Sequence, residues 1–293
     1  MIAVDRGRWT VVPDGDAQCR VVAMRARELG RTPVVVGDRV GLVGDLSGRP
    51  DTLARIVRVA ERASVLRRTA DDTDPYERIV VANAEQLMIV SSLADPPPRF
   101  GLIDRCVVAA FAGGLRPVLC LTKADLAPAA EILRNYAELD IPSVVCRIDE
   151  PPDALREALA GRVSALVGHS GVGKSTLVNA LVPDADRAVG VVSAIGKGRH
   201  TSSSAVALPL PGGGWVVDTP GIRSFGLAHV TPPDLLAAFP DLAEGAEDCP
   251  RGCTHRSAQE GCRLDDYVAA GHSTPGRLAS FRRLLAARTA PDR

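Results

Sequence analysis

Short apolar runs separated by turn residues fill the first part of the chain. The turns include residues 13–16 (P-D-G-D) and 37–38 (G-D), which interrupt runs rich in β-branched side chains. Five short strands are therefore predicted, at residues 9–12, 19–24, 34–36, 39–43 and 54–59. Five such strands within residues 1–68 favour a small closed β-barrel of the OB type.

From residue 79 the pattern changes to continuous apolar runs that alternate with helical segments. Strands are predicted at 79–83, 86–90, 116–121, 162–167 and 215–217, and helices at about 101–112 and from residue 176. Continuous apolar strands between helices indicate a parallel sheet that is covered on both faces. We therefore expect a central α/β domain over residues 69–232.

A glycine-rich loop between the strand at 162–167 and the following helix matches the phosphate-binding pattern G-x-x-x-x-G-K-[ST]. A strand that leads through such a loop into a helix makes an anion site, because backbone N–H groups turn toward the phosphates. Lys174 is expected to reach the β- and γ-phosphates, and the Ser175 hydroxyl to bind Mg²⁺. The P-loop residues are Gly168, His169, Ser170, Gly171, Val172, Gly173, Lys174, Ser175 and Thr176.

The alternative for this loop is an ordinary glycine-rich turn between a strand and a helix. The chain has 32 arginines and only three lysines, so a chance lysine in the one required position is improbable. The other two lysines are Lys123 and Lys197, and Lys123 also lies in a nucleotide-site pattern. This use of lysine favours the P-loop interpretation.

Residues 122–125 (T-K-A-D) follow a predicted strand and resemble the [NT]-K-x-D base-recognition motif of GTPases. There an aspartate accepts hydrogen bonds from guanine N1 and N2, and the lysine stem lies over the ring. Adenine lacks that pair of donors, so Asp125 would select GTP over ATP. A solvated strand end is the alternative, and the presence of a P-loop in the same chain counts against it.

Residues 218–221 (D-T-P-G) follow the strand at 215–217 and match D-x-x-G. Asp218 could hold Mg²⁺ through water, and the Gly221 N–H could contact the γ-phosphate. Thr201 is the candidate switch threonine that completes the Mg²⁺ shell. Base recognition comes last in ordinary GTPases, whereas here it precedes the P-loop, which predicts a circularly permuted domain.

Residues 233–293 form the expected third unit. Its pattern C-x₃-C-x-H-x₆-C, made by Cys249, Cys253, His255 and Cys262, suits a closed tetrahedral Zn²⁺ site without an open catalytic position. Free structural cysteines are the alternative, but the other four cysteines are isolated in apolar runs. A mostly helical unit is expected, with a helix at about 274–287, held together by metal because its own core is thin.

Net charge is zero but uneven. Residues 1–68 hold 13 basic and 8 acidic side chains, residues 69–250 hold 14 and 23, and residues 251–293 hold 8 and 4. Two basic ends permit a polyanionic partner such as RNA, although ordinary solvated surfaces explain the same charges. No apolar run approaches the roughly 18 residues of a membrane span, and the start has no signal-peptide pattern, so we expect a cytoplasmic protein.

Together, T-K-A-D, G-H-S-G-V-G-K-S-T, G-K-G-R-H-T and D-T-P-G-I, with the barrel and the Cys₃His pattern, resemble the ribosome small-subunit-dependent GTPase A (RsgA) family over essentially the whole chain. The resemblance implies GTP hydrolysis stimulated by the small ribosomal subunit, a role in its late maturation, and rRNA contacts by the barrel and zinc unit. It implies GTP or GDP with Mg²⁺ and one structural Zn²⁺ as bound groups. It assigns Lys174, Ser175, Thr201 and Asp218 to phosphate and Mg²⁺, and Thr122, Lys123 and Asp125 to guanine.

The residue after D-x-x-G is Ile222, which cannot orient water as the glutamine of Ras-like enzymes does. Intrinsic hydrolysis should therefore be slow, and our hypothesis is that His200, in G-R-H-T, positions the water; a solvent-facing or RNA-contacting histidine is the alternative. The second base-binding loop is expected at 145–147. A small-molecule kinase or ATPase and an RNA-binding module set by nucleotide remain the alternative functions, and a monomer without membrane contact is expected.

Overall fold

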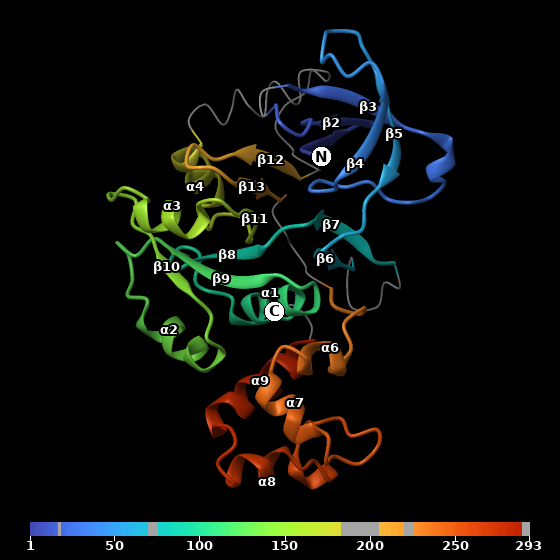
Figure 1. The fold of residues 1–293 in the computed structure, drawn as a ribbon. Helices are drawn as coiled ribbons and strands as arrows, with labels where there is room; N and C mark the ends of the chain where they lie inside the picture. The colour runs from blue at the N-terminus through green and yellow to red at the C-terminus, as the bar shows by residue number, and fades with distance from the viewer. Residues whose placement is uncertain (17–18, 70–75, 183–204, 220–225, 289–293) are drawn as a thin grey trace.

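The computed structural model describes residues 1–16, 19–69, 76–182, 205–219 and 226–288. Figure 1 shows strands of the N-terminal unit at one end, a central sheet flanked by helices, and a helical C-terminal unit at the other end. No helix within these described ranges is both long enough and apolar enough to cross a bilayer.

Five strands build the N-terminal unit: β1 (Ala3–Asp5), β2 (Arg8–Val11), β3 (Val21–Arg25), β4 (Val40–Gly44) and β5 (Ala54–Val59). β2 pairs antiparallel with β1 and β3, while β5 pairs parallel with β3 and antiparallel with β4. The small core between them contains Val11, Val21, Ala23, Val34, Ala54 and Ile56. Among the described residues no ladder joins β4 to β1, so closure into an OB barrel stays a prediction.

The strand predicted at 34–36 is wrong, and β1 is the strand that the pattern missed. Val34 and Val36 are buried, which explains the apolar signal, but residues 32–35 have no regular secondary structure and residues 36–37 form a turn. The Asp38 carboxylate accepts a hydrogen bond from Val35 N (2.8 Å) and pairs with Arg62 (2.7 Å). The Val34 and Val36 side chains are therefore buried by a connection that the Asp38 side chain stabilises, and not by pairing with another strand.

The central domain contains a parallel sheet, as predicted. Its parallel strands are β10 (Ser143–Val145), β9 (Arg116–Thr122), β8 (Gln86–Ser92), β11 (Val163–Val167) and β13 (Trp215–Asp218), in that spatial order, with β12 (Val206–Pro209) antiparallel at the edge. Alternate side chains of these strands enter two separate cores. Helices α1 (Phe100–Ala112) and α2 (Ala130–Tyr136) cover one face, and α3 (Asp153–Leu159) and α4 (Lys174–Leu181) cover the other.

The strand predicted at 79–83 exists but lies outside the parallel sheet. It is β7 (Arg78–Ala82), which pairs antiparallel with β6 (Val65–Arg68) in a separate hairpin. Leu66 and Val81 of the hairpin are fully buried against the α1 side of the central domain. The expected boundary at 68/69 falls at the end of β6 and the one at 232/233 falls inside a helix, so the extents of the three units stay predictions.

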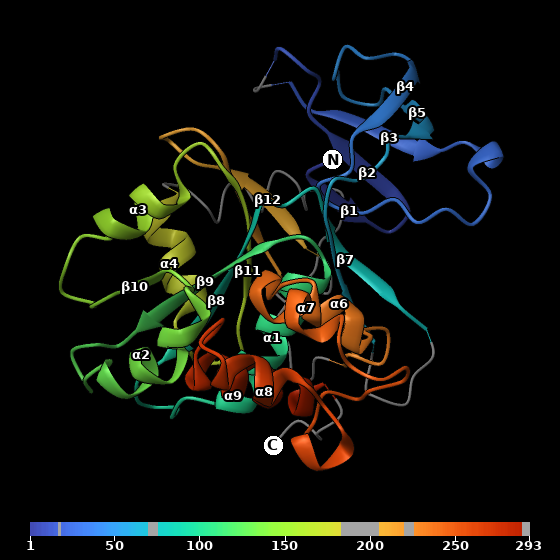
Figure 2. The ribbon, with the colours of Figure 1, turned by 60° about the horizontal axis from the view of Figure 1, so that its bottom comes forward.

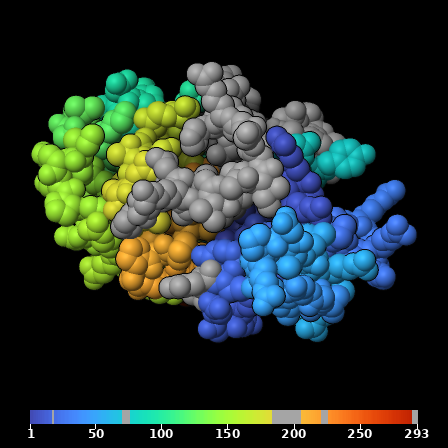
Figure 3. All heavy atoms as spheres, turned by 90° about the horizontal axis from the view of Figure 1, so that it is seen from above, coloured from blue at the N-terminus to red at the C-terminus, as the bar shows by residue number. Residues whose placement is uncertain are grey.

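The N-terminal unit and the central sheet are joined edge to edge. Ala3 of β1 pairs with Val206 of β12, and Ala207 N donates to the Ile2 carbonyl at 2.8 Å. The result is one eleven-stranded sheet, in the order β10-β9-β8-β11-β13-β12-β1-β2-β3-β5-β4. Figure 3 shows the orange residues of the β12–β13 region beside the blue N-terminal strands.

The C-terminal unit consists of α6 (Pro232–Leu236), α7 (Pro240–Ala246), α8 (Leu264–Ala269) and α9 (Pro275–Ala287). The helix expected at about 274–287 is α9, and the Thr274 hydroxyl caps it by accepting from Arg277 N (3.0 Å). Figure 2 shows the unit lying against α1. Buried Arg105 of α1 donates to the Ala287 carbonyl at 2.8 Å, and Asp104 pairs with Arg283 at 3.3 Å. Three short 3₁₀ turns, Arg27–Leu29, Ala137–Leu139 and Ala258–Glu260, complete the elements of the described ranges.

Gly37 lies where the N-terminal unit approaches β7. Its φ is +90°, and a Cβ built there would lie 1.8 Å from the Ala82 carbonyl oxygen. Gly7 has a similar φ of +78° but has nothing within 4 Å of its Cβ position. Alanine substitutions at Gly7 and Gly37 therefore distinguish the cost of a positive φ from the cost of a steric clash.

We predict that Gly7→Ala costs about 1–2 kcal/mol from positive φ alone. Gly37→Ala should cost about 1–3 kcal/mol more, because the Ala82 backbone must move. Urea denaturation followed by circular dichroism would compare the two variants. Equal shifts of the denaturation midpoint would contradict the close approach of these two segments.

Candidate nucleotide site and metal centre

The P-loop connects β11 to α4 with backbone geometry that requires glycine. Gly171 and Gly173 have φ of +86° and +89°, in the left-handed region. A Cβ on Gly168 would lie 2.6 Å from the Val90 carbonyl oxygen of β8. Gly173 is the N-cap of α4, and Lys174 is the first residue of the helix. The loop therefore brings backbone N–H groups and the positive end of α4 together at the carboxyl edge of the sheet.

Lys174 is brought into contact with the D-x-x-G segment. Its ammonium donates to the Asp218 carboxylate and to the Thr219 carbonyl, and its side chain is only 10% exposed. β13 is the parallel neighbour of β11, with Leu166 opposite Asp218. Binding of phosphate at Lys174 therefore requires the ammonium to exchange this carboxylate for phosphate oxygens.

Thr219 is a residue whose role the sequence did not indicate. It is fully buried, and its hydroxyl donates to the Leu166 carbonyl of β11 at 2.6 Å. This bond fixes the start of the D-x-x-G segment to the P-loop strand. Thr219 occupies an x position of D-x-x-G, where the motif specifies no residue type. Only its small polar side chain at the end of a strand could have indicated a role.

Thr122 joins the base-recognition loop to the P-loop. Its buried hydroxyl donates to the Val172 carbonyl at 2.6 Å, and its own carbonyl accepts from Leu93 N at 2.9 Å. The structure thus gives Thr122 a positioning contact with the P-loop backbone. Its expected role at guanine stays a prediction.

The rest of the T-K-A-D loop faces two other segments. Lys123 adopts a positive φ of 59°, and its ammonium donates to the Asp95 carbonyl of the loop after β8. Ala124 N donates to the Cys146 carbonyl at 3.2 Å, which places the predicted second base loop at 145–147 directly beside T-K-A-D. Asp125 is exposed at this edge, where a base could reach its carboxylate.

The loop after β8 is part of the site that the sequence did not reveal. Pro96 lies 3.5 Å from the Cβ position of Gly171, and its carbonyl accepts from the Ser92 hydroxyl at 2.7 Å. The available signal was its position at the carboxyl end of a parallel strand, where α/β sheets bind ligands.

The remaining predicted residues lie partly within the described ranges. Ser175 and Thr176 are exposed at the start of α4, and His169 places Nδ1 at 2.8 Å from the Ser170 carbonyl. The other candidates, His200, Thr201, Gly221 and Ile222, lie outside the described residues.

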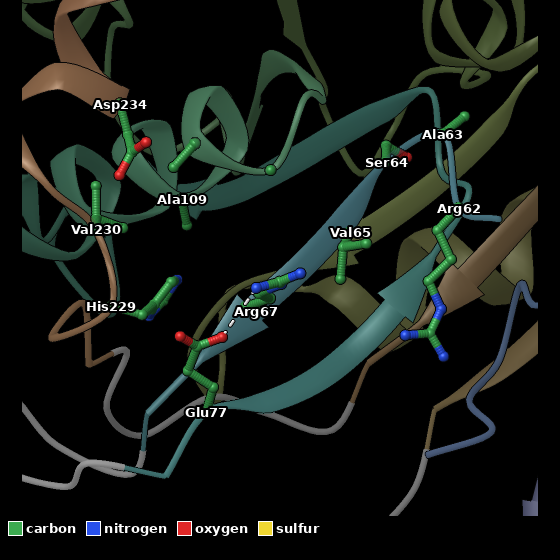
Figure 4. Close-up of a pocket in the computed structure, with 12 residues that line it drawn as sticks. Arg62, Ala63, Ser64, Val65, Arg67, Glu77, Ala109, His229, Val230 and Asp234 are labelled. Atoms are coloured by element: carbon green, nitrogen blue, oxygen red, sulfur yellow. Dashed lines mark hydrogen bonds and ion pairs between the residues drawn. The ribbon is translucent and has the colours of Figure 1, made fainter. Parts of the chain in front are cut away.

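A cavity of about 280 Å³ lies away from the P-loop, between the hairpin, α1 and the segment before α6 (Figure 4). Arg67 in its wall pairs with Glu77 at 3.0 Å, and Arg62 pairs with Asp38 at 2.7 Å. Burial lowers the pKa of His229, so its imidazole is neutral at pH 7. The cavity therefore lacks the excess positive charge that a phosphate group would need.

Four side chains of the C-terminal unit converge as the metal pattern predicts. The ligand atoms of Cys249, Cys253, His255 and Cys262 all lie within 4.8 Å of one another, and Cys262 Sγ is 3.8 Å from His255 Nδ1. Tetrahedral ligands around zinc are separated by about 3.5–3.8 Å, so the donor set fits Zn²⁺. Burial raises the pKa of the Cys262 thiol to about 11, and a bound cation would be needed to keep it ionised at neutral pH.

The family model described as RsgA GTPase matches residues 59–228. A protein named small ribosomal subunit biogenesis GTPase RsgA from Pseudomonas aeruginosa (strain LESB58) is 40% identical over 223 residues, which cover 73% of this chain and 65% of that relative, just under two thirds of its length. A protein of the same name from Chlorobaculum parvum is 34% identical over 293 residues, covering 95% of this chain and 94% of the relative.

Two solved structures resemble the whole chain. YjeQ from Thermotoga maritima has a TM-score of 0.68 and 25% identity, covering 98% of this chain and 96% of that chain. YloQ, described as a circularly permuted GTPase, has a TM-score of 0.67 at 21% identity, covering 98% and 93%. The permuted arrangement predicted from the motif order is thereby confirmed at the level of the fold.

We predict that Thr122→Val weakens binding of guanine nucleotide about tenfold, because the buried Val172 carbonyl loses its donor and the P-loop loses its tie to T-K-A-D. Thr122→Ser keeps the hydroxyl and should bind within about twofold of the parent protein. Titration with a fluorescent GDP analogue would measure both affinities. Equal affinities of the two variants for the GDP analogue would show that the Thr122 hydroxyl does not contribute to nucleotide binding.

We predict about one zinc per chain in the purified protein, measured by elemental analysis. Cys253→Ala should lose the metal and lower the melting temperature, since the metal compensates for a thin local core. Cys19→Ala is the matched control, because Cys19 lies in the N-terminal unit away from the cluster. Unchanged zinc content in Cys253→Ala would contradict the site.

Proposed function

The chain belongs to the RsgA GTPase family, and we propose that it hydrolyses GTP to GDP and phosphate and acts in biogenesis of the small ribosomal subunit. The observation that carries this proposal is the convergence of three motifs at one sheet edge. Lys174 of the P-loop contacts Asp218 of D-x-x-G, and Thr122 of T-K-A-D contacts the P-loop backbone. The residues expected to bind phosphate, Mg²⁺ and the base are thereby held together at this edge.

We infer that GTP binds with Mg²⁺ at this edge. Lys174 and the first turn of α4 would hold the β- and γ-phosphates, Ser175 and Asp218 would serve Mg²⁺, and Asp125 would accept from guanine. When phosphate replaces Asp218 as the partner of the Lys174 ammonium, binding of Mg²⁺ would compensate the charge of the Asp218 carboxylate. The sites of Thr201 and Gly221 belong to the same proposal from their motifs alone.

The finer role that we propose is ribosome-stimulated hydrolysis during late maturation of the subunit. Ile222 follows D-x-x-G, so a group other than a glutamine must position water, and His200 remains our candidate. The N-terminal unit presents Arg55 and Arg58 on the exposed side of β5, which supports contact with the phosphates of rRNA. We propose the C-terminal unit, which would hold one structural Zn²⁺, as the second contact with rRNA. We also propose that the protein is a cytoplasmic monomer.

The test is turnover of GTP and of ATP by the purified protein, with and without isolated small ribosomal subunits. We expect slow turnover selective for GTP that rises at least tenfold with subunits, because a group ordered by the ribosome must complete the site. Lys174→Ala should abolish turnover, and Asp125→Ala should weaken GTP binding at least tenfold. Asp153→Ala, an exposed carboxylate on α3, is the matched control and should match the parent protein.

Equal turnover of GTP and ATP would remove the guanine assignment, and indifference to the subunit would remove the proposed partner. Bound GTP that never turns over would favour an RNA-binding module set by nucleotide. In the same assay, His200→Ala should bind GTP normally and lose the stimulation; undiminished stimulation would overturn the role proposed for His200.

A further inference from the structure

Two cysteines meet beside the T-K-A-D motif, one in a strand and the other in the loop that follows the neighbouring strand. Cys120 lies in β9, two residues before Thr122, and Cys146 follows the end of β10. Their Sγ atoms are 3.9 Å apart. A disulfide requires about 2.05 Å, so the sulfurs would need to approach by about 1.9 Å. Val144 is the register partner of Cys120, so Cys146 is its diagonal neighbour, and diagonal pairs have Cα atoms about 7–8 Å apart. Formation of the disulfide therefore requires the backbone at Cys146 to move toward Cys120.

The two thiols differ in access and in chemistry. Cys120 is fully buried in the core beneath α3 and α4, whereas Cys146 is half-buried at the edge of that core. The hydrogen bond from the Cys120 thiol lowers the pKa of Cys146, because it stabilises the Cys146 thiolate. Cys146 is therefore the nucleophilic and accessible member, and Cys120 is placed to resolve its oxidation product.

The backbone of Cys146 is hydrogen-bonded to the residue before the T-K-A-D motif and to a residue within the motif. Its N–H donates to the Leu121 carbonyl at 2.7 Å, and its carbonyl accepts from Ala124 N at 3.2 Å. A displacement of Cys146 toward Cys120 would therefore disturb the hydrogen bond that holds the two base loops together. The chemical state of this thiol pair is mechanically linked to the geometry of the base site.

We propose that Cys120 and Cys146 form an oxidation site, in which a hydroperoxide converts the thiol pair to a disulfide and thereby weakens guanine nucleotide binding. The effect on nucleotide rests on the proposed GTP site, whereas formation of the disulfide does not. The candidate zinc ligands are half-buried or buried and lie in the C-terminal unit, so their oxidation would be a separate reaction.

The reaction balances with the hydroperoxide as oxidant. The Cys146 thiolate attacks one peroxide oxygen, the O–O bond breaks, and the departing hydroxide takes a proton and leaves as water, or as an alcohol when the oxidant is an alkyl hydroperoxide. The Cys120 sulfur then attacks the Cys146 sulfenic sulfur; the S–S bond forms, the S–O bond breaks, and the hydroxyl leaves as water with the Cys120 proton. Two thiols are oxidised and one peroxide is reduced, and a dithiol reverses the disulfide.

The experiment treats the full zinc-loaded chain with hydrogen peroxide and maps disulfides by mass spectrometry of non-reduced peptides. Trypsin leaves Cys106 and Cys120 on one peptide, because Arg116 precedes proline. Mapping is therefore repeated in Cys106→Ala, where the link from that peptide to Cys146 should persist. In Cys120→Ala the link should be absent.

Affinity for a fluorescent GDP analogue is measured on the same samples. We expect about tenfold weaker binding after oxidation, restored by dithiothreitol, because the contact between the base loops is disturbed. Cys120→Ala, compared with itself before and after peroxide, should change less than twofold. Absence of a link between Cys120 and Cys146 would overturn the site, and a link without loss of affinity would overturn its effect on nucleotide.

The two proposals fail in distinguishable ways. Reduced protein that binds no GDP would contradict the proposed nucleotide site while the peptide map still decides the thiol pair. Loss of affinity that persists in Cys120→Ala would assign the effect to other cysteines and would overturn the inference.

Discussion

The common direction of five parallel strands is the constraint on which the site depends. Because β9, β8, β11 and β13 run the same way, the residues that follow each strand meet at one edge. Thr122 then needs one hydroxyl bond, to Val172, to fix the base loop against the phosphate loop. Circular permutation leaves this geometry intact, because the position of a motif at a strand end does not depend on the order in which the chain visits the strands.

Local chemistry made the motifs predictable from sequence, and long-range pairing made the rest unpredictable. The P-loop, the metal ligands and α9 each depend on residues within a short stretch, so their pattern contains the information. Thr122 and Val172 are 50 residues apart, and no local pattern could show that the hydroxyl binds the P-loop backbone. The same limit applies to β1, whose three residues pair with β2 and whose Ala3 also pairs with Val206 of β12, about 200 residues later in the chain.

The motif order places structural units next to the D-x-x-G segment. Thr69, after β6, pairs with Gly226, which follows the D-x-x-G segment, through Thr69 N and the Gly226 carbonyl at 3.1 Å. The C-terminal unit begins a few residues later and is fixed to α1 by Arg105 and Arg283. A change near D-x-x-G is therefore adjacent to contacts with the β6–β7 hairpin and with the C-terminal unit, which gives a physical route between the proposed nucleotide site and the C-terminal surface proposed to contact RNA.

The contact between Lys174 and Asp218 argues for joint binding of metal and phosphate. Removing one partner from a partly buried ion pair is unfavourable, because the other charge is left uncompensated. A phosphate that takes Lys174 alone would leave Asp218, 32% exposed, beside a second negative group. A metal ion that binds Asp218 through water at the same step removes that repulsion. The two proposed ligands would therefore compensate each other, and we expect the proposed nucleotide to bind as its Mg²⁺ complex.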